Sequence, residues 1–264
     1  MTELDGIHYI NYPIFLHRDA HLDFKQMIQD IASYGIYQSS IKDGTSDEVD
    51  MREGLRYLGY RDDVDEAILD VWKKRAIAIQ KFADRLKRGE TNYPIAGVQA
   101  SLIKELRDEE NTRKKIDEFL ASRAVISILG KKNCIKTNNK HVMARMMGFN
   151  TYKEFDIFYK NARPWTGDLD LSYDMYERYL DPKGQISKYK MKTLFKRLLN
   201  SWKILKASDS NRGYYVAKDN VKPHYMTMSK LAQRIIADKK NKNSKSDRLE
   251  LEFKRALLSL KKSA

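Results

Sequence analysis

The sequence predicts a mainly α-helical protein with small β-hairpins. Apolar residues make up 42% of its 264 residues and charged residues 33%, so the chain can bury a core beneath a well-solvated surface. Apolar residues recur at helical spacing in many segments, several of which open with a residue that can cap a helix. Five prolines and twelve glycines are few for this length, which disfavours folds built from many tight turns.

The first elements predicted are one extended segment and two helices. Residues 9–16 are rich in β-formers and predict a short strand or arm, which Pro13 interrupts. Apolar positions at helical spacing predict a helix from about His21 to Ala32. A capping box at residues 45–48 predicts the start of a second helix, which ends near residue 59.

The clearest helical pattern starts at residues 63–66 and ends at Gly89, with apolar residues from Ala67 to Leu86 on one face. Pro94 then breaks the chain before a further helix, which we expect to run through Val98, Leu102, Ile103 and Leu106. We therefore predict that residues 1–110 form one mildly acidic helical region. Its role would be to form a homodimer or to contact a protein partner.

The character of the chain changes after residue 110. A helix is expected from Asn111 or Thr112 to Gly130, followed by a short strand at 134–136. Two helices, at 141–147 and 154–161, are expected on either side of a turn that begins at Gly148. Helix, strand, helix, turn and helix is the order of a helix-turn-helix core, which predicts one such unit at residues 111–163.

A similar order is expected in the next segment, residues 164–222. A helix capped by Ser172 precedes a long helix from Ser187 to Trp202, whose predicted buried stripe is Met191, Leu194, Phe195, Leu198, Leu199 and Trp202. Strand-like segments at 203–207 and 213–217 follow, joined by five residues of turn chemistry. A helix followed at once by a β-hairpin is the winged-helix arrangement. The remaining residues, 223–264, are expected to form a basic helical tail.

The formal net charge is +14, and it is unevenly distributed. Residues 1–112 carry a net charge of −6, residues 113–163 of +8, residues 164–181 of −4 and residues 182–264 of +16. Basic charge gathered into two blocks is the electrostatic pattern expected of a protein that binds a polyanion. The alternative is that these charges only keep the surface solvated.

We expect the basic residues of the helix at 187–202 to lie opposite its apolar stripe and to continue into the hairpin. Lysines that face phosphates supply affinity, whereas Arg197 and Asn200 are the better candidates for base edges, because their side chains can form two hydrogen bonds to one base. The predicted nucleic-acid contacts of this unit are Lys188, Lys190, Lys192, Lys196, Arg197, Asn200, Lys203, Lys206 and Arg212. Those of the unit at 111–163 are His141, Arg145 and Lys153, unless that unit packs or dimerises while the other binds.

Other chemistry is not indicated. His17 and His21 have the i, i+4 spacing of zinc ligands, with Asp23 as a third, but we expect them to be polar surface residues. Asp168 and Asp170 could hold magnesium if they lay in a strand, and we expect a polar loop instead. No catalytic residue, metal or cofactor is therefore predicted.

The chain also carries signals about its compartment. Cys134 is the single cysteine, which excludes an internal disulfide and fits a reducing compartment. No apolar stretch is long enough to span a membrane and no secretory signal is visible, so we expect a cytoplasmic protein.

Two segments, residues 131–149 and 191–216, resemble winged-helix DNA-binding proteins. Two helix-turn-helix units with a basic tail look like the replication initiators and regulators of phages, plasmids and other mobile elements. The resemblance implies a non-enzymatic protein that binds double-stranded DNA and recognises either its sequence or its structure. It implies a role in replication or in the regulation of transcription. Two alternatives remain open at this point: an adaptor or inhibitor that acts on a nucleoprotein complex, and a metal-dependent nuclease or nucleotidyltransferase that uses Asp168 and Asp170.

Overall fold

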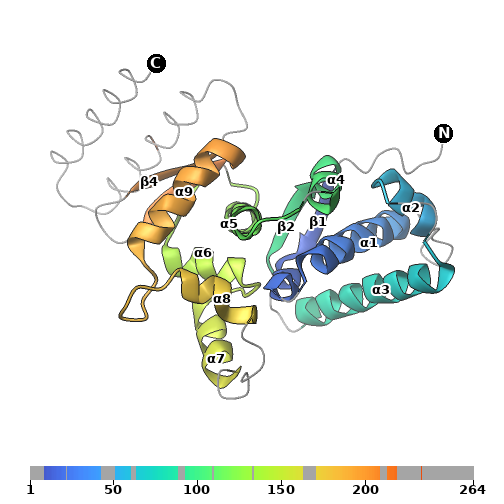
Figure 1. Cartoon of the computed structure of the whole chain (residues 1–264), viewed down its shortest axis with the longest axis horizontal. Helices are drawn as coiled ribbons and strands as arrows, with labels where there is room; N and C mark the ends of the chain where they lie inside the picture. The colour runs from blue at the N-terminus through green and yellow to red at the C-terminus, as the bar shows by residue number, and fades with distance from the viewer. Residues whose placement is uncertain are drawn as a thin grey trace.

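The computed structural model describes residues 9–21, 23–42, 51–60, 64–88, 93–108, 110–132, 134–162, 171–208, 213–218 and 233. It confirms a mainly α-helical fold with two small antiparallel sheets (Figure 1). The predicted capping box at 45–48 and nearly all of the predicted tail at 223–264 lie outside these residues. Within the described part of the chain, no helix combines the length and the apolar character needed to cross a bilayer.

The N-terminal half is built on a strand pair that links its two ends. Strand β1 (Tyr9–Pro13) pairs antiparallel with β2 (Ile95–Gln99), which places Ile10 opposite Val98. The predicted helix through Val98 is therefore wrong in its first part, because the helix α4 (Ala100–Asp108) begins only after the strand. The apolar spacing near Val98 suits both structures, and pairing with a segment some 85 residues earlier decides for the strand.

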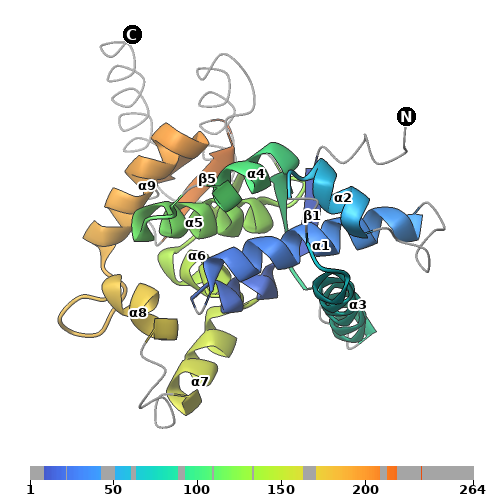
Figure 2. The ribbon, with the colours of Figure 1, turned by 45° about the vertical axis from the view of Figure 1, so that its right-hand side comes forward.

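Helices cover this strand pair. A 3-10 helix, η2 (Ile14–His21), leads into α1 (Phe24–Lys42), which packs against α3 (Glu66–Arg88), while the short α2 (Met51–Tyr57) lies near the far end of α1 (Figure 2). An ion pair between a buried carboxylate and a partly exposed guanidinium joins α1 to α3: the Nε atom of Arg75 lies 2.8 Å from Oδ1 of Asp30.

The predicted apolar face of α3 is only partly buried. The start at residues 63–66 is confirmed, and Leu69, Ala76 and Ala83 are in the core. Ile68 and Val71 were predicted to lie on the same face, yet they are 46% and 53% exposed. The helix thus buries the line from Leu69 to Ala83 and leaves part of its apolar surface in solvent.

Helix α5 (Arg113–Leu129) lies between the two halves of the molecule (Figure 1). Its ends follow the predicted signals: Thr112 accepts a hydrogen bond from the amide of Lys115, and Gly130 ends the helix at a φ of 53°. Strand β3 (Cys134–Thr137), helix α6 (Asn139–Met146) and helix α7 (Tyr152–Ala162) then come in the predicted order.

The remaining elements are α8 (Leu171–Arg178), α9 (Lys188–Trp202), β4 (Ile204–Ser208) and β5 (Tyr214–Lys218). The predicted hairpin is present, but β3 also joins it, giving a sheet in the order β3-β5-β4. At the start of β5, a Cβ atom on Gly213 would lie 2.6 Å from the carbonyl oxygen of Thr137, so the close approach of the strands requires glycine. Strands from residues 111–163 and 164–222 therefore share one sheet.

A buried polar contact joins the two halves. His17 was predicted to be a surface residue, but its ring is fully buried and bonds to the hydroxyl of Tyr12 and to the carbonyl oxygen of Arg145. The hydroxyl of Tyr93 donates to the carbonyl of Gly148 at 2.7 Å. Buried polar groups with partners on both sides fix the halves to each other.

Candidate nucleic-acid interface

Helix α9 has one face in the core and turns directly into the hairpin. Ser187 caps its first turn by accepting a hydrogen bond from the amide of Lys190. Phe195 contacts Tyr214 of β5 edge to face, with ring centroids 5.2 Å apart. Lys203 ends the helix in a left-handed conformation, with a φ of 51°, so the chain reverses within one residue and enters β4. This reversal places the hairpin beside the last turn of α9.

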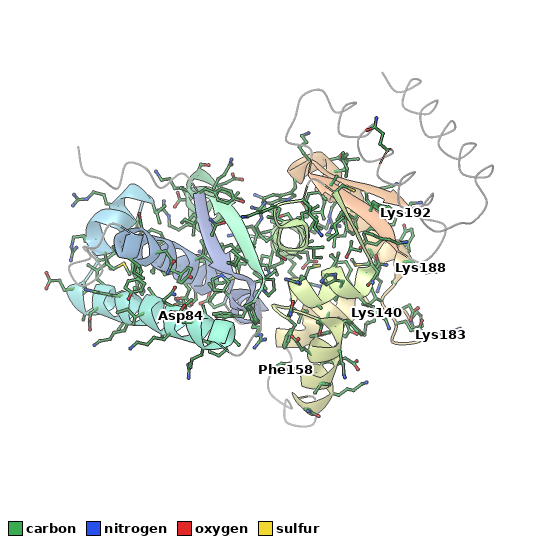
Figure 3. The ribbon with its side chains drawn as sticks, turned by 180° about the vertical axis from the view of Figure 1, so that it is seen from behind. Asp84, Lys140, Phe158, Lys183, Lys188 and Lys192 are labelled. Atoms are coloured by element: carbon green, nitrogen blue, oxygen red, sulfur yellow. The ribbon has the colours of Figure 1, made fainter. Side chains whose placement is uncertain are left out.

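Five of the predicted contacts on α9 and its C-cap are exposed lysines: Lys188, Lys190, Lys192, Lys196 and Lys203. Leu199, predicted to belong to the buried stripe, is 38% exposed between them. Lys188 and Lys192 lie along the same edge of the molecule as Lys140 of α6 and Lys183 of the loop after α8 (Figure 3). Lys140 and Lys183 were not predicted as contacts, although each lies in a basic segment of the sequence.

Lys206 of β4 packs against two aromatic rings. Its Nζ atom lies 3.8 Å from the ring centroid of Tyr214 and 4.5 Å from that of Phe195. Burial, together with the nearby charge of Lys192, lowers the pKa of Lys206 to about 8. A negative partner would stabilise the charged form, so Lys206 is a cation whose charge responds to what binds beside it.

Two predicted contacts on α9 bond to other parts of the chain. The Nε atom of Arg197 lies 2.8 Å from Oε1 of Glu118 on α5. Lys190 donates from Nζ to the carbonyl oxygen of Leu180 at 2.7 Å. At 100° per residue, Arg197 lies only about 60° around the helix from buried Leu194, so it faces α5. Arg197 therefore helps to hold α9 against α5. Its assignment to a base edge stays a prediction.

The predicted contacts in the unit at 111–163 are mostly internal as well. Arg145 is buried, and its guanidinium donates to Nε2 of His141 and to Oδ1 of Asn150. Burial lowers the pKa of Arg145 to about 10, and burial together with Arg145 lowers the pKa of His141. Arg145 therefore links α6 to the loop after it, and His141 is half-buried beside it. The assignment of both as nucleic-acid contacts stays a prediction. Lys153 on α7 is exposed, as predicted.

The metal sites considered as alternatives are not seen in the described part of the chain. No group of three or more potential metal ligands is present there. Asp168, Asp170 and the predicted contact Arg212 lie outside the described residues. The prediction that Asp168 and Asp170 form a polar loop therefore stays a prediction.

Sequence reasoning missed two exposed residues of α9, Tyr189 and Thr193. Tyr189 is 79% exposed, the highest fraction among the large hydrophobic side chains that the structure describes. The hydroxyl of Thr193 donates to the carbonyl oxygen of Tyr189 at 3.2 Å. Both lie roughly opposite the centre of the buried stripe when α9 is projected at 100° per residue, a projection that the sequence alone allows. We define the α9 face as Lys188, Tyr189, Lys192, Thr193, Lys196 and Asn200.

No protein-family model, curated protein or solved structure matches this chain.

Proposed function

We propose that this protein is a non-enzymatic DNA-binding protein that places the α9 face in the major groove of a duplex. The observation that carries the proposal is the composition of that face. Three exposed lysines lie on a helix whose other side is anchored in the core and which runs directly into a β-hairpin. Lysines on a rigid helix bind phosphates as point charges without ordering a flexible segment first.

The dimensions support duplex DNA as the partner. Helix α9 has 15 residues, which at 1.5 Å per residue gives a length of about 22 Å. A helix with its side chains is about 10–12 Å wide, which fits a B-form major groove of about 12 Å. The deep, narrow major groove of A-form RNA does not admit a helix of this width. The hairpin beside the last turn of α9 would then contact the flanking backbone.

The cellular role proposed is that of a replication initiator or transcription regulator of a mobile element, and it rests on the resemblance to winged-helix proteins. We further propose that residues 1–110 contact another protein or a second copy of this chain. The exposure of Ile68 and Val71 on α3 supports that assignment. Helix α3 lies at the opposite end of the molecule from α9 (Figure 1), so both surfaces could be occupied together.

A duplex titration at several salt concentrations tests the proposal. The wild type should bind a fluorescent duplex with an affinity that falls steeply as salt rises, because bound phosphates release counterions. Each of the changes Lys188→Ala, Lys192→Ala and Lys196→Ala should lower the slope of log affinity against log salt by roughly one. Lys81→Ala removes an exposed lysine from α3 and serves as the matched control, with no expected effect.

Salt-independent binding, or an equal effect of Lys81→Ala, would reject the α9 face as the interface. An adaptor that acts through proteins would show no duplex affinity in the same titration. A nuclease or transferase would require magnesium and would convert its substrate, which the fluorescent duplex reports directly after electrophoresis.

A further inference from the structure

The α9 face divides into a charged side and an uncharged row. At 100° per residue, Tyr189, Thr193 and Asn200 fall within an arc of about 40° that lies opposite the buried stripe. Lys188, Lys192 and Lys196 lie on the side of the row nearer Lys206, whose pKa Lys192 helps to lower. On the other side, Lys190 and Arg197 are held by Leu180 and Glu118.

We propose that Tyr189, Thr193 and Asn200 are the residues that read base edges, and that the three lysines only fix the helix on the phosphates. This inference rests on the proposed function and deepens it. Uncharged side chains at the outermost line of a helix are the first to reach the floor of a groove, whereas lysines beside them reach outwards to its walls. The row thus assigns specificity to three residues and affinity to three others.

Each member of the row offers a different contact. The exposed amide of Asn200 can form two hydrogen bonds with adenine. The hydroxyl hydrogen of Thr193 is used within the helix, so Thr193 presents its methyl group and the remaining acceptor positions of its oxygen. Tyr189 presents a ring that is 79% exposed and can contact the methyl group of thymine. We therefore expect a preferred site rich in A·T pairs.

The spacing sets the length of that site. Eleven residues separate Tyr189 from Asn200, which is about 16 Å along the helix axis. With about 3.4 Å between base pairs, the row covers roughly five base pairs. Tyr189 lies in the first turn of α9, where recognition helices usually approach the bases.

Selection from a random duplex library, followed by binding assays, tests this assignment with the full chain. The quantity measured is the ratio of affinities for the selected duplex and for a scrambled duplex of equal composition. Tyr189→Ala, Thr193→Ser and Asn200→Ala should each reduce that ratio by about 5- to 100-fold while affinity for the scrambled duplex changes less than 2-fold. Lys192→Ala should do the reverse: it should weaken both affinities about equally. Asn161→Ala, at an exposed position near the end of α7, is the matched control for Asn200→Ala.

The outcomes separate this inference from the proposed function. If the wild type binds duplexes but selection enriches no motif, or if Tyr189→Ala and Asn200→Ala weaken both duplexes equally, the assignment is wrong although DNA binding stands. If the wild type binds no duplex, the proposed function itself fails. Thr193→Ser keeps the hydroxyl that bonds within the helix, so its loss of ratio cannot be attributed to unfolding of α9.

Discussion

Replacement of Lys206 by methionine should stabilise the protein at neutral pH. The ammonium group of Lys206 lies against the rings of Phe195 and Tyr214, and burial lowers its pKa from the ordinary value of 10.5 to about 8. A change of one pKa unit corresponds to about 1.4 kcal/mol, so the full lowering sets an upper limit of about 3.4 kcal/mol on the destabilisation. Methionine has a similar length, packs well against aromatic rings and carries no charge.

Two effects reduce that limit. Lys206 is only partly buried, so solvent screens a large part of its charge. Attraction between the ammonium group and the two rings returns about 0.5–1 kcal/mol. We therefore expect Lys206→Met to raise the free energy of unfolding by about 1 kcal/mol at pH 7.

The sign of the pH dependence follows from the pKa. Because the pKa of Lys206 is lower in the folded state, the unfolded state binds more protons between pH 8 and 10.5. The stability of the wild type should therefore rise relative to Lys206→Met across this window, whereas below pH 8 the difference should be constant. Urea unfolding of both proteins at pH 7, 8.5 and 10 measures this difference, and other groups that titrate in the window cancel. A variant no more stable than the wild type at pH 7, or an undiminished advantage at pH 10, would refute the reasoning.

Three further changes test other parts of the structure. Lys203→Gly should raise the thermal midpoint by a few degrees, because glycine adopts the left-handed conformation without strain, and should lower the salt slope of duplex binding by about one; an unchanged slope would remove Lys203 from the interface. Gly213→Ala should destabilise the protein by about 2–3 kcal/mol in urea unfolding, because its Cβ atom would lie 2.6 Å from the carbonyl of Thr137, and wild-type stability would contradict the described sheet. Asp117→Asn should lower the free energy of unfolding by about 2 kcal/mol, because the buried carboxylate of Asp117 accepts a charge-assisted hydrogen bond from Arg178; a loss under 0.5 kcal/mol would show that this pair does not hold α5 to α8.

Local signals in the sequence predicted most of the helix boundaries. Thr112 and Ser187 each accept a hydrogen bond from an amide of the first turn, as the pattern of capping residues indicates. These contacts form between neighbours in the chain, so no knowledge of the fold is needed to expect them. The hairpin after α9 was predictable for the same reason.

Features that depend on distant segments were not predictable in this way. Val98 is in a strand because residues 9–13 are available to pair with it. Glu118 pairs with Arg197 because α5 and α9 are neighbours in space, and the charge of Arg197 alone gives no sign of that contact. The helical period shows that Arg197 and Asn200 lie at different angles around α9. It does not show which side of α9 is covered by α5.

The pairing of β3 with β5 has a consequence for the order in which the molecule folds. The two strands are about 80 residues apart in sequence, whereas only five residues separate β4 from β5. Closing the long loop costs more chain entropy than forming the hairpin, and contacts between distant segments slow folding. The hairpin should therefore form early beside α9 and gain its final orientation late, when β3 docks on β5 and makes it the central strand. During synthesis, β5 leaves the ribosome long after β3, so the sheet that supports α9 is completed only when nearly the whole described chain has been made.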